Sequence, residues 1–147
     1  MYKDKRISVI IPALNEEKSI PLVINDLPKD IVDEIIVVDN RSSDNTATAA
    51  KESGARVVKE ETKGYGAACQ KGIACSESSD IIVILDADYS DYPDRICQIL
   101  DPILEQGFDM VLGSRVLGDA EKGSMTLPQV FGNRLATFLI AMITGFK

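Results

Sequence analysis

Short apolar runs alternate along the chain with longer segments of mixed character. The runs cover residues 7–11, 34–39, 56–58, 81–85 and 108–112, and their length is typical of strands rather than helices. Strands that alternate with helices indicate βαβ units and a mainly parallel sheet. The run at 81–85 is unbroken, which predicts a strand buried on both faces. The pattern therefore predicts an α/β fold with helices on both faces of the sheet.

Residues that break or start helices mark the segments between the runs. Pro12 is expected to end the first strand. Ser43 or Asp44 is expected to cap the second helix, and Gly54 to close it. The predicted helices cover residues 15–27, 45–54, 67–77, 93–106 and 129–144. No linker or repeat interrupts this order, so the sequence predicts a single domain over residues 1–147.

Composition restricts the function more than the fold. The 147 residues carry a net charge of −7 and include no histidine. A nucleic-acid partner needs a basic face, so the charge argues against one. The missing histidine excludes Ser-His-Asp and Cys-His chemistry and makes a zinc site a poor fit. Cys69, Cys75 and Cys97 form no C-x-x-C pair, and we expect them to be core residues in a reducing cytoplasm.

Polar side chains follow each predicted strand, and parallel strands bring such residues to one edge of the sheet. Asp86 and Asp88 stand one residue apart, and their hard oxygen ligands suit Mg²⁺ or Mn²⁺. They would share one cation, or one would hold the metal and the other a sugar hydroxyl. Taken alone, the two aspartates are better explained as a solvated acidic turn. The other edge residues are Asn15, Glu16, Asp39, Asn40, Lys63, Ser114 and Arg115. Carboxylates flanked by single cations suit a nucleotide diphosphate.

Four motifs occur in order and at fitting distances: Ile10-Ile11-Pro12-Ala13-Leu14-Asn15-Glu16-Glu17, Val37-Val38-Asp39-Asn40-Arg41-Ser42-Ser43-Asp44-Asn45-Thr46, Lys63-Gly64-Tyr65-Gly66-Ala67-Ala68 and Leu85-Asp86-Ala87-Asp88. Together they resemble the family 2 glycosyltransferases, which have the Rossmann-like GT-A fold. Within that family the chain is most similar to the dolichyl- or polyprenyl-phosphate sugar synthases. Gly113-Ser114-Arg115 and Phe131-Gly132-Asn133-Arg134-Leu135-Ala136 point the same way.

The resemblance implies a role for individual residues. Asp39 would bind the base, Asp86 would face the ribose or the metal, and Asp88 would be the principal metal ligand and a catalytic residue. Arg115, also catalytic, and Arg134 would hold the donor diphosphate or the acceptor phosphate. The remaining nucleotide-sugar contacts would come from Pro12, Ala13, Asn15, Glu16, Lys63 and Ala87.

The implied reaction is an inverting displacement at the anomeric carbon of a UDP- or GDP-linked sugar, with Mg²⁺ or Mn²⁺ as cofactor. The implied acceptor is a polyprenyl or dolichyl phosphate, with a sugar as the variant. A lipid phosphate is already an anion, so it needs little help from a general base. The resemblance favours a cytoplasmic protein, or one that is peripheral on the cytoplasmic face of a membrane. The polar N-terminus predicts no signal peptide, and no apolar run is long enough to cross a bilayer.

The chain departs from the family pattern in three places. Asp39-Asn40-Arg41-Ser42 stands where the family has Asp-Asp-Gly-Ser, and Ser90 stands where some lipid-phosphate enzymes have glutamine. The sequence given stops at Lys147, before the stretch that completes the sheet and the acceptor side in family members. The apolar face over residues 135–146 is then expected either to pack on the sheet or to contact a membrane surface or a second copy of the chain.

Two other functions fit part of the pattern. Asp86-Ala87-Asp88-Tyr89-Ser90 resembles the Asp-x-Asp-x-Thr motif of haloacid-dehalogenase-type phosphatases, but it follows the fourth predicted strand rather than the first. A module that binds donor or supports assembly without turnover is the other alternative.

Overall fold

The computed structural model describes residues 1–114 together with Ala136 and Met142. The chain divides into two units, Met1–Val111 and Leu112–Lys147. The first unit contains the sheet and is the subject of the following paragraphs. In the second, Ala136 and Met142 are helical, while the rest of the predicted helix over 129–144 lies outside the described residues.

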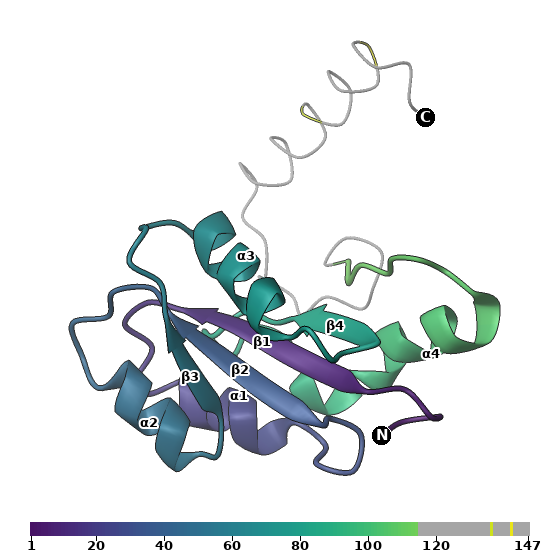
Figure 1. Cartoon of the computed structure of the whole chain (residues 1–147), viewed down its shortest axis with the longest axis horizontal. Coiled ribbons are helices and arrows are strands. Elements are labelled where there is room, and N and C mark those ends of the chain that lie inside the picture. Colours follow the sequence, from purple (N-terminus) through teal and green to yellow (C-terminus); the bar gives the residue numbers. More distant parts are fainter. Residues whose placement is uncertain (115–135, 137–141, 143–147) are drawn as a thin grey trace, which may run out of the picture. The chain divides into compact units, whose positions relative to one another are not determined.

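Four parallel strands form the sheet of the first unit, in the order β3-β2-β1-β4 (Figure 1). The strands are β1 (Ile7–Ala13), β2 (Glu34–Asp39), β3 (Arg56–Lys59) and β4 (Ile81–Ile84). β1 pairs with β2 on one side and with β4 on the other. The predicted parallel α/β sheet is therefore confirmed for its first four strands.

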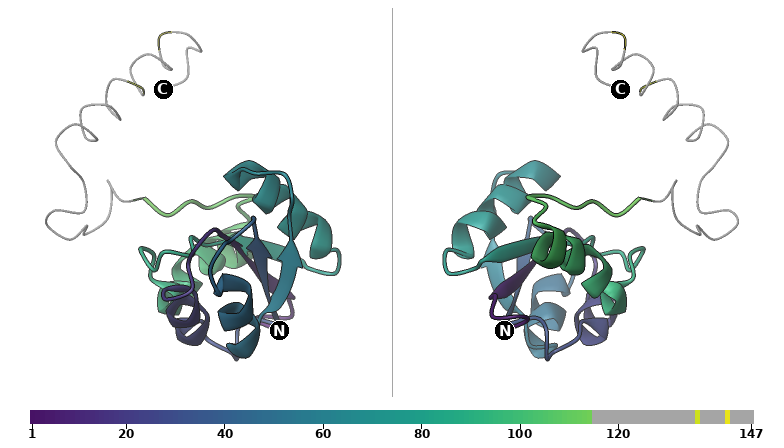
Figure 2. Two further views of the ribbon diagram at one scale, coloured as in Figure 1. Left: turned by 90° about the vertical axis from the view of Figure 1, so that its left-hand side faces the viewer. Right: turned by 90° about the vertical axis from the view of Figure 1, so that its right-hand side faces the viewer.

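Helices cover both faces of this sheet, as the sequence predicts. They are α1 (Ile20–Asp26), α2 (Thr46–Glu52), α3 (Tyr65–Cys75), the short 3₁₀ helix η1 (Pro93–Arg95) and α4 (Cys97–Gln106). α1 and α2 lie on one face and α3 lies on the other (Figures 1 and 2). α4 ends as expected at Gly107, which adopts the left-handed conformation with a φ of 73°.

Alternate residues of the strands pack in two separate parts of the core, one on each face of the sheet. Val9, Ile11 and Val37 belong to the larger apolar cluster, which also includes buried residues of α1, α2 and α4. Ile10, Ile36 and Val38 point to the other face and pack with Ala68 of α3. This division follows from the two-residue period of a strand, which sends successive side chains to opposite faces.

α3 approaches the sheet closely because Gly72 faces it. A Cβ atom at this position would lie 2.3 Å from Cγ2 of Ile10 and 3.2 Å from Cγ2 of Val38. Real Cβ atoms do not come that close, so the absence of a side chain at Gly72 sets the spacing between α3 and the sheet.

β4 differs from its predicted burial. Ile81 and Val83 are buried, but Ile82 and Ile84 are 37% and 41% exposed. Ile84 pairs with Ile10, whose side chain faces α3. The contacts of α3 are mainly with β1 and β2, so the same face of β4 is left partly open, and an unbroken apolar run did not mean burial on both faces.

The fifth predicted strand, residues 108–112, is wrong. This segment forms no strand, and in the described part of the chain β4 pairs only with β1. Met110 is 69% exposed. Apolar composition alone does not make a strand, because a strand also needs a neighbour to receive its backbone hydrogen bonds.

Several boundaries also shift. Pro12 does not end β1, which continues to Ala13. Asn15 lies in a bend and residues 17–19 form a turn, so α1 begins at Ile20 rather than at Asn15. α3 covers Tyr65–Cys75 instead of 67–77. The three cysteines are free and half-buried rather than fully in the core.

Replacing Gly72 with alanine is expected to destabilise the protein by about 1–3 kcal/mol, the usual cost of an overpacked core. The matched control is Gly66→Ala on the same helix, because a Cβ at Gly66 meets nothing within 4 Å. We expect Gly66→Ala to be neutral or slightly stabilising, since alanine favours helix. Urea unfolding measures both. Equal stability of the two variants would contradict a close approach of α3 to the sheet at Gly72.

Candidate functional site at the carboxyl ends of the strands

The order in which the chain adds strands across the sheet reverses after β3, so that β4 lies on the free side of β1. The chain runs from β1 to β2 to β3 in one direction across the sheet, and then returns to place β4 on the opposite side of β1. The connection from β3 to β4 carries α3, which lies on the opposite face from α1 and α2 (Figure 1). In open α/β sheets, ligands bind outside the carboxyl ends of the strands at such a switch point. We call the loops that follow β1 to β4 the carboxyl edge.

Hydrogen bonds join the loops that follow β1 and β2. The backbone N–H of Asn15 donates to Oγ of Ser42 at 3.0 Å, and Oδ1 of Asn15 accepts from the backbone N–H of Ser43 at 2.8 Å. The N–H of Glu16 donates to Oγ1 of Thr46 at 2.7 Å. Oδ2 of Asp44 accepts from the backbone N–H of Glu17. The side chain of Asn15 is therefore committed to holding the two loops together.

Asp44 supports the start of α2. Its Oδ1 accepts from the backbone N–H of Thr46 at 3.0 Å and also from the Thr46 hydroxyl. The bond from the Thr46 side chain, followed by backbone bonds, lowers the pKa of Asp44 below its ordinary value. The expected choice of Ser43 or Asp44 as cap is close to what is seen: the capping position is Asn45, but Asp44 supplies the acceptor.

Asn40 joins the ends of β2 and β3 to the start of α3. Its Nδ2 donates to the carbonyl oxygens of Glu60 and Thr62 at 3.0 and 2.8 Å. Its Oδ1 accepts from the backbone N–H of Gly64 at 2.7 Å. Asn40 is buried, so these three bonds replace the water that its amide loses on folding.

Asp39 ends β2 directly beside this amide. The residue is 7% exposed, and its Oδ1 accepts from the backbone N–H of Ser42 at 3.0 Å. Arg41, inside that turn, has a φ of 70°, a conformation that is uncommon for residues other than glycine. Arg41 is exposed. The position where family 2 has glycine is therefore one where the backbone takes a glycine-type conformation.

The turn that follows β4 is folded by its own carboxylates. Oδ1 of Asp88 accepts from the backbone N–H of Ser90 at 2.9 Å, and Oδ2 of Asp91 accepts from the backbone N–H of Asp86 at 3.2 Å. Tyr89 has a φ of 61°, and its hydroxyl donates to Oδ2 of Asp26 in the last turn of α1. Asp86 is half-buried and Asp88 is exposed, so both carboxylates lie at the surface of the carboxyl edge.

Tyr65 of α3 contacts Asp86, and sequence reasoning gave this tyrosine no role. Its hydroxyl donates to Oδ1 of Asp86 at 3.0 Å. Partial burial, followed by the hydrogen bond and the negative charge of Asp86, raises the pKa of Tyr65 above its ordinary value. The phenol therefore stays a donor at neutral pH. No motif signals this contact, because it depends on the spatial neighbourhood of α3 and β4.

Asp86 and Asp88 suit a divalent cation whose other ligands are substrate phosphates and water. Among the residues that the structure describes, no group of three or more Asp, Glu or Cys side chains is arranged to hold a metal ion. A complete protein cage is not what Mg²⁺ requires, since it is commonly bound by one or two carboxylates plus substrate phosphates and water. Asp86 and Asp88, oxygen ligands in one exposed turn, meet that description.

The other predicted site residues fall into three groups. Pro12 and Ala13 lie in β1 and Ala87 in the turn after β4, and all three are buried, so they could face a ligand mainly through their backbones. Glu16 is half-buried, with Oε2 accepting from the Ser19 hydroxyl, and Lys63 is exposed. Arg115 and Arg134 lie outside the described residues.

The switch point and its acidic edge are typical of ligand sites in open α/β sheets, and comparison with known proteins gives the family. Residues 8–146 match the glycosyl transferase family 2, and the chain belongs to this family. It is 34% identical to the UDP-N-acetylglucosamine–dolichyl-phosphate N-acetylglucosaminyltransferase of Methanococcus voltae, over 97% of this chain and 65% of that protein. It is 30% identical to the dolichyl-phosphate hexose transferase of Haloferax volcanii, over 99% of this chain and 60% of that protein.

Solved structures confirm the GT-A-like fold. Glucosyl-3-phosphoglycerate synthase from Mycobacterium tuberculosis, in complex with Mn²⁺, UDP-glucose and phosphoglyceric acid, is 36% identical with a TM-score of 0.63, over 69% of this chain and 40% of that one. The same enzyme has been solved with Mg²⁺ and UDP. The chain spans between 45% and 65% of the length of the archaeal relatives in Methanocaldococcus jannaschii, Methanococcus voltae and Haloferax volcanii.

Replacing Asn40 tests the connection between the loops. Asn40→Ala removes three hydrogen bonds from a buried position and is expected to cost about 2–4 kcal/mol of stability. Asn40→Asp keeps an acceptor for Gly64 but turns a carboxylate towards two carbonyl oxygens, so it is expected to destabilise as well at pH 7. Denaturant unfolding measures both. Asn25→Ala, at an exposed position of α1, is the control and should change stability by less than about 0.5 kcal/mol. Wild-type stability of Asn40→Asp would show that the two donated bonds contribute little.

Proposed function

We propose that this chain carries the donor-binding part of an inverting, metal-dependent glycosyltransferase that moves a sugar from a nucleotide diphosphate to a lipid phosphate. The observation that supports this most directly is the placement of the acidic residues around the switch point. Asp39 ends β2 and Asp86 follows β4, and these strands flank β1. Two strand spacings, about 10 Å in all, separate them. A nucleoside is of that size.

The proposed roles follow from this placement. Asp39, at the β2 end, accepts from an N–H of the base. Asp86 faces the ribose or the metal, and Asp88 is the principal metal ligand. Asn15, Glu16 and Lys63 line the nucleotide pocket, as do the backbones of Pro12, Ala13 and Ala87. Arg115 and Arg134 hold the donor diphosphate or the acceptor phosphate.

The reaction needs little proton transfer. An oxygen of the acceptor phosphate attacks the anomeric carbon from the face opposite the leaving group, and the bond between that carbon and the diphosphate oxygen breaks. The electron pair leaves with the nucleotide diphosphate. A bound Mg²⁺ or Mn²⁺ would neutralise charge on that leaving group, while the chain's own carboxylates position the donor.

Relatives support the choice of acceptor. Two of them are named as transferases that act with dolichyl phosphate, whereas the solved synthase was captured with phosphoglyceric acid. Both molecules carry a phosphate, and we favour the lipid because both curated relatives align over almost the whole chain. A helix with the length and hydropathy of a membrane span is absent from the described residues. We propose that contact with the lipid acceptor is peripheral, through the apolar residues 135–146.

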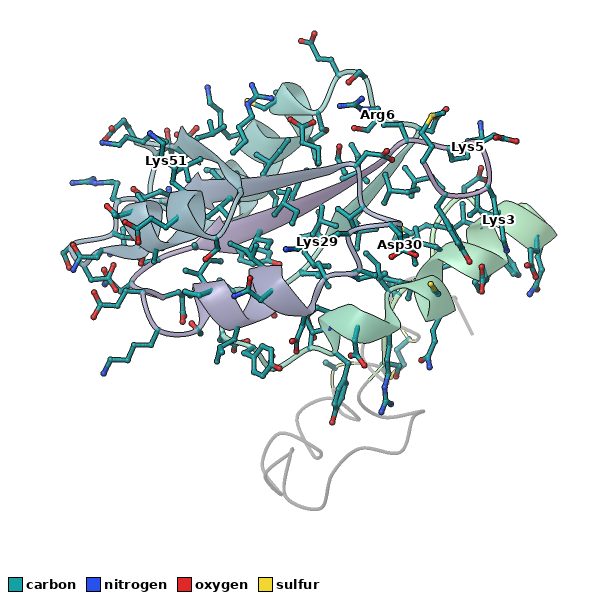
Figure 3. The ribbon with its side chains drawn as sticks, turned by 90° about the horizontal axis from the view of Figure 1, so that it is seen from below. Lys3, Lys5, Arg6, Lys29, Asp30 and Lys51 are labelled. Carbon is teal, nitrogen blue, oxygen red and sulfur yellow. The ribbon has the colours of Figure 1, made fainter. Side chains whose placement is uncertain are left out.

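Nucleotide binding is the first test. Calorimetry on the full 147-residue chain is expected to show Mn²⁺-dependent binding of UDP or GDP. Asp88→Asn is expected to reduce the metal-dependent affinity at least tenfold, or about 1.4 kcal/mol, because a metal-ligating carboxylate is lost. The control is Asp30→Asn, since Asp30 lies in an exposed turn after α1 (Figure 3). A wild-type chain that binds neither nucleotide, with or without Mn²⁺, would refute the proposed donor.

Transfer from radiolabelled donor to polyprenyl phosphate tests the acceptor. Label appearing in lipid is the expected result, and activity confined to a water-soluble sugar would rule out the lipid assignment. Nucleotide binding without transfer to any acceptor would favour the module without turnover. Family membership already favours the transferase over the haloacid-dehalogenase-type phosphatase.

A further inference from the structure

Tyr65 occupies a position at the carboxyl edge that the proposed roles do not use. It is the first residue of α3, and its side chain reaches across to the turn after β4, where its hydroxyl donates to Oδ1 of Asp86 at 3.0 Å. Within the described part of the chain, this is the one hydrogen bond that the carboxylate of Asp86 accepts. The residue is 59% exposed, so burial of its ring does not account for its position.

The backbone that carries Tyr65 is itself held in place. Gly64 has a φ of 141°, a conformation that a side chain would strain, and its N–H donates to Oδ1 of Asn40 at 2.7 Å. Asn40 follows Asp39 directly. A continuous path of bonds therefore runs from the end of β2, through Gly64 and Tyr65, to Asp86 at the end of β4.

A single donor on one carboxylate oxygen fixes the orientation of the group and leaves it further acceptor positions. An aspartate in a surface turn otherwise samples several side-chain orientations, and binding a ligand would require it to give these up. Ordering Asp86 in advance lowers that cost. The bond to Tyr65 thus acts on the affinity for whatever Asp86 binds, more than on the stability of the fold.

We propose that Tyr65 is a positioning residue, whose hydroxyl holds Asp86 in the orientation that the ribose or the metal of a nucleotide-sugar donor requires. This inference rests on the proposed function, because it takes the donor as the ligand of Asp86. Tyr65 acts through Asp86 and need not touch the donor itself.

A double-mutant cycle on the full chain tests the inference by calorimetric titration of UDP in the presence of Mn²⁺. Tyr65→Phe keeps the ring and removes the hydroxyl, and is expected to weaken binding about three- to tenfold, within the usual cost of ordering one side chain on binding. Asp86→Ala removes the acceptor of this bond and is expected to weaken binding as well. In the Asp86→Ala background, Tyr65→Phe should change affinity less than twofold, because the carboxylate that Tyr65 positions is gone.

The matched control is Tyr2→Phe. The Tyr2 hydroxyl donates to Oδ1 of Asp101 at 2.9 Å, so this variant loses the same kind of bond at the opposite end of β1. Lys3 marks that end in Figure 3, where it lies beside α4 and pairs with Asp101. Tyr2→Phe should leave UDP affinity unchanged. Thermal unfolding of each variant checks that it folds.

Three results would overturn the positioning role of Tyr65. Wild-type affinity in Tyr65→Phe would overturn the positioning role and leave the proposed function intact. An equal loss in both backgrounds would overturn it too, since Tyr65 would then act independently of Asp86. A wild-type chain that binds no UDP or GDP would overturn the proposed function and this inference together.

Discussion

The candidate site depends on β1, which pairs with β2 on one side and with β4 on the other. All seven of its residues are buried. The carbonyl of Ala13 accepts from Asn40 after β2, and the carbonyl of Ile10 accepts from Leu85 after β4. Alternate residues of β1 thus bond to opposite neighbours, and Pro12, which lacks a backbone donor, faces the β4 side beyond the last paired residue. The ladder loses no bond there, which explains how β1 continues through a proline.

Side chains join the loops at the carboxyl ends of these strands. Asn15 holds the loops after β1 and β2 together, Asn40 connects the loops after β2 and β3, and Tyr65 reaches the turn after β4. None of these bonds belongs to the regular ladder. Each satisfies backbone or side-chain groups that the ends of the strands leave without partners. The acidic residues that we assign to the donor are supported by neighbours that need not touch it.

Periodicity predicted the α/β class, four of the strands, and helices on both faces of the sheet. These features depend on the local pattern of apolar residues and on the parallel arrangement of the strands. Periodicity failed for residues 108–112 and for the burial of Ile82 and Ile84, because pairing and coverage depend on what lies beside a strand. The place of Asp86 and Asp88 after β4 was predicted from the sequence, since they follow an apolar run directly. Tyr65 was not, since its partner lies 21 residues further along the chain.

The Asp39-Asn40-Arg41-Ser42 segment shows that its two departures from the family pattern differ physically. Asn40 is suited to its place: an amide donates to two carbonyls and accepts from one N–H, which an ionised aspartate cannot do. Arg41 is not, since a residue with a Cβ in the left-handed region costs about 1 kcal/mol. The turn persists because three hydrogen bonds determine its path. The Ser42 N–H donates to Oδ1 of Asp39, the Asn15 N–H donates to Oγ of Ser42, and the Ser43 N–H donates to Oδ1 of Asn15. The backbone conformation around Asp39 is thus set by these neighbours rather than by the preference of Arg41, and that is why the carboxylate at the end of β2 can keep its place when glycine is absent.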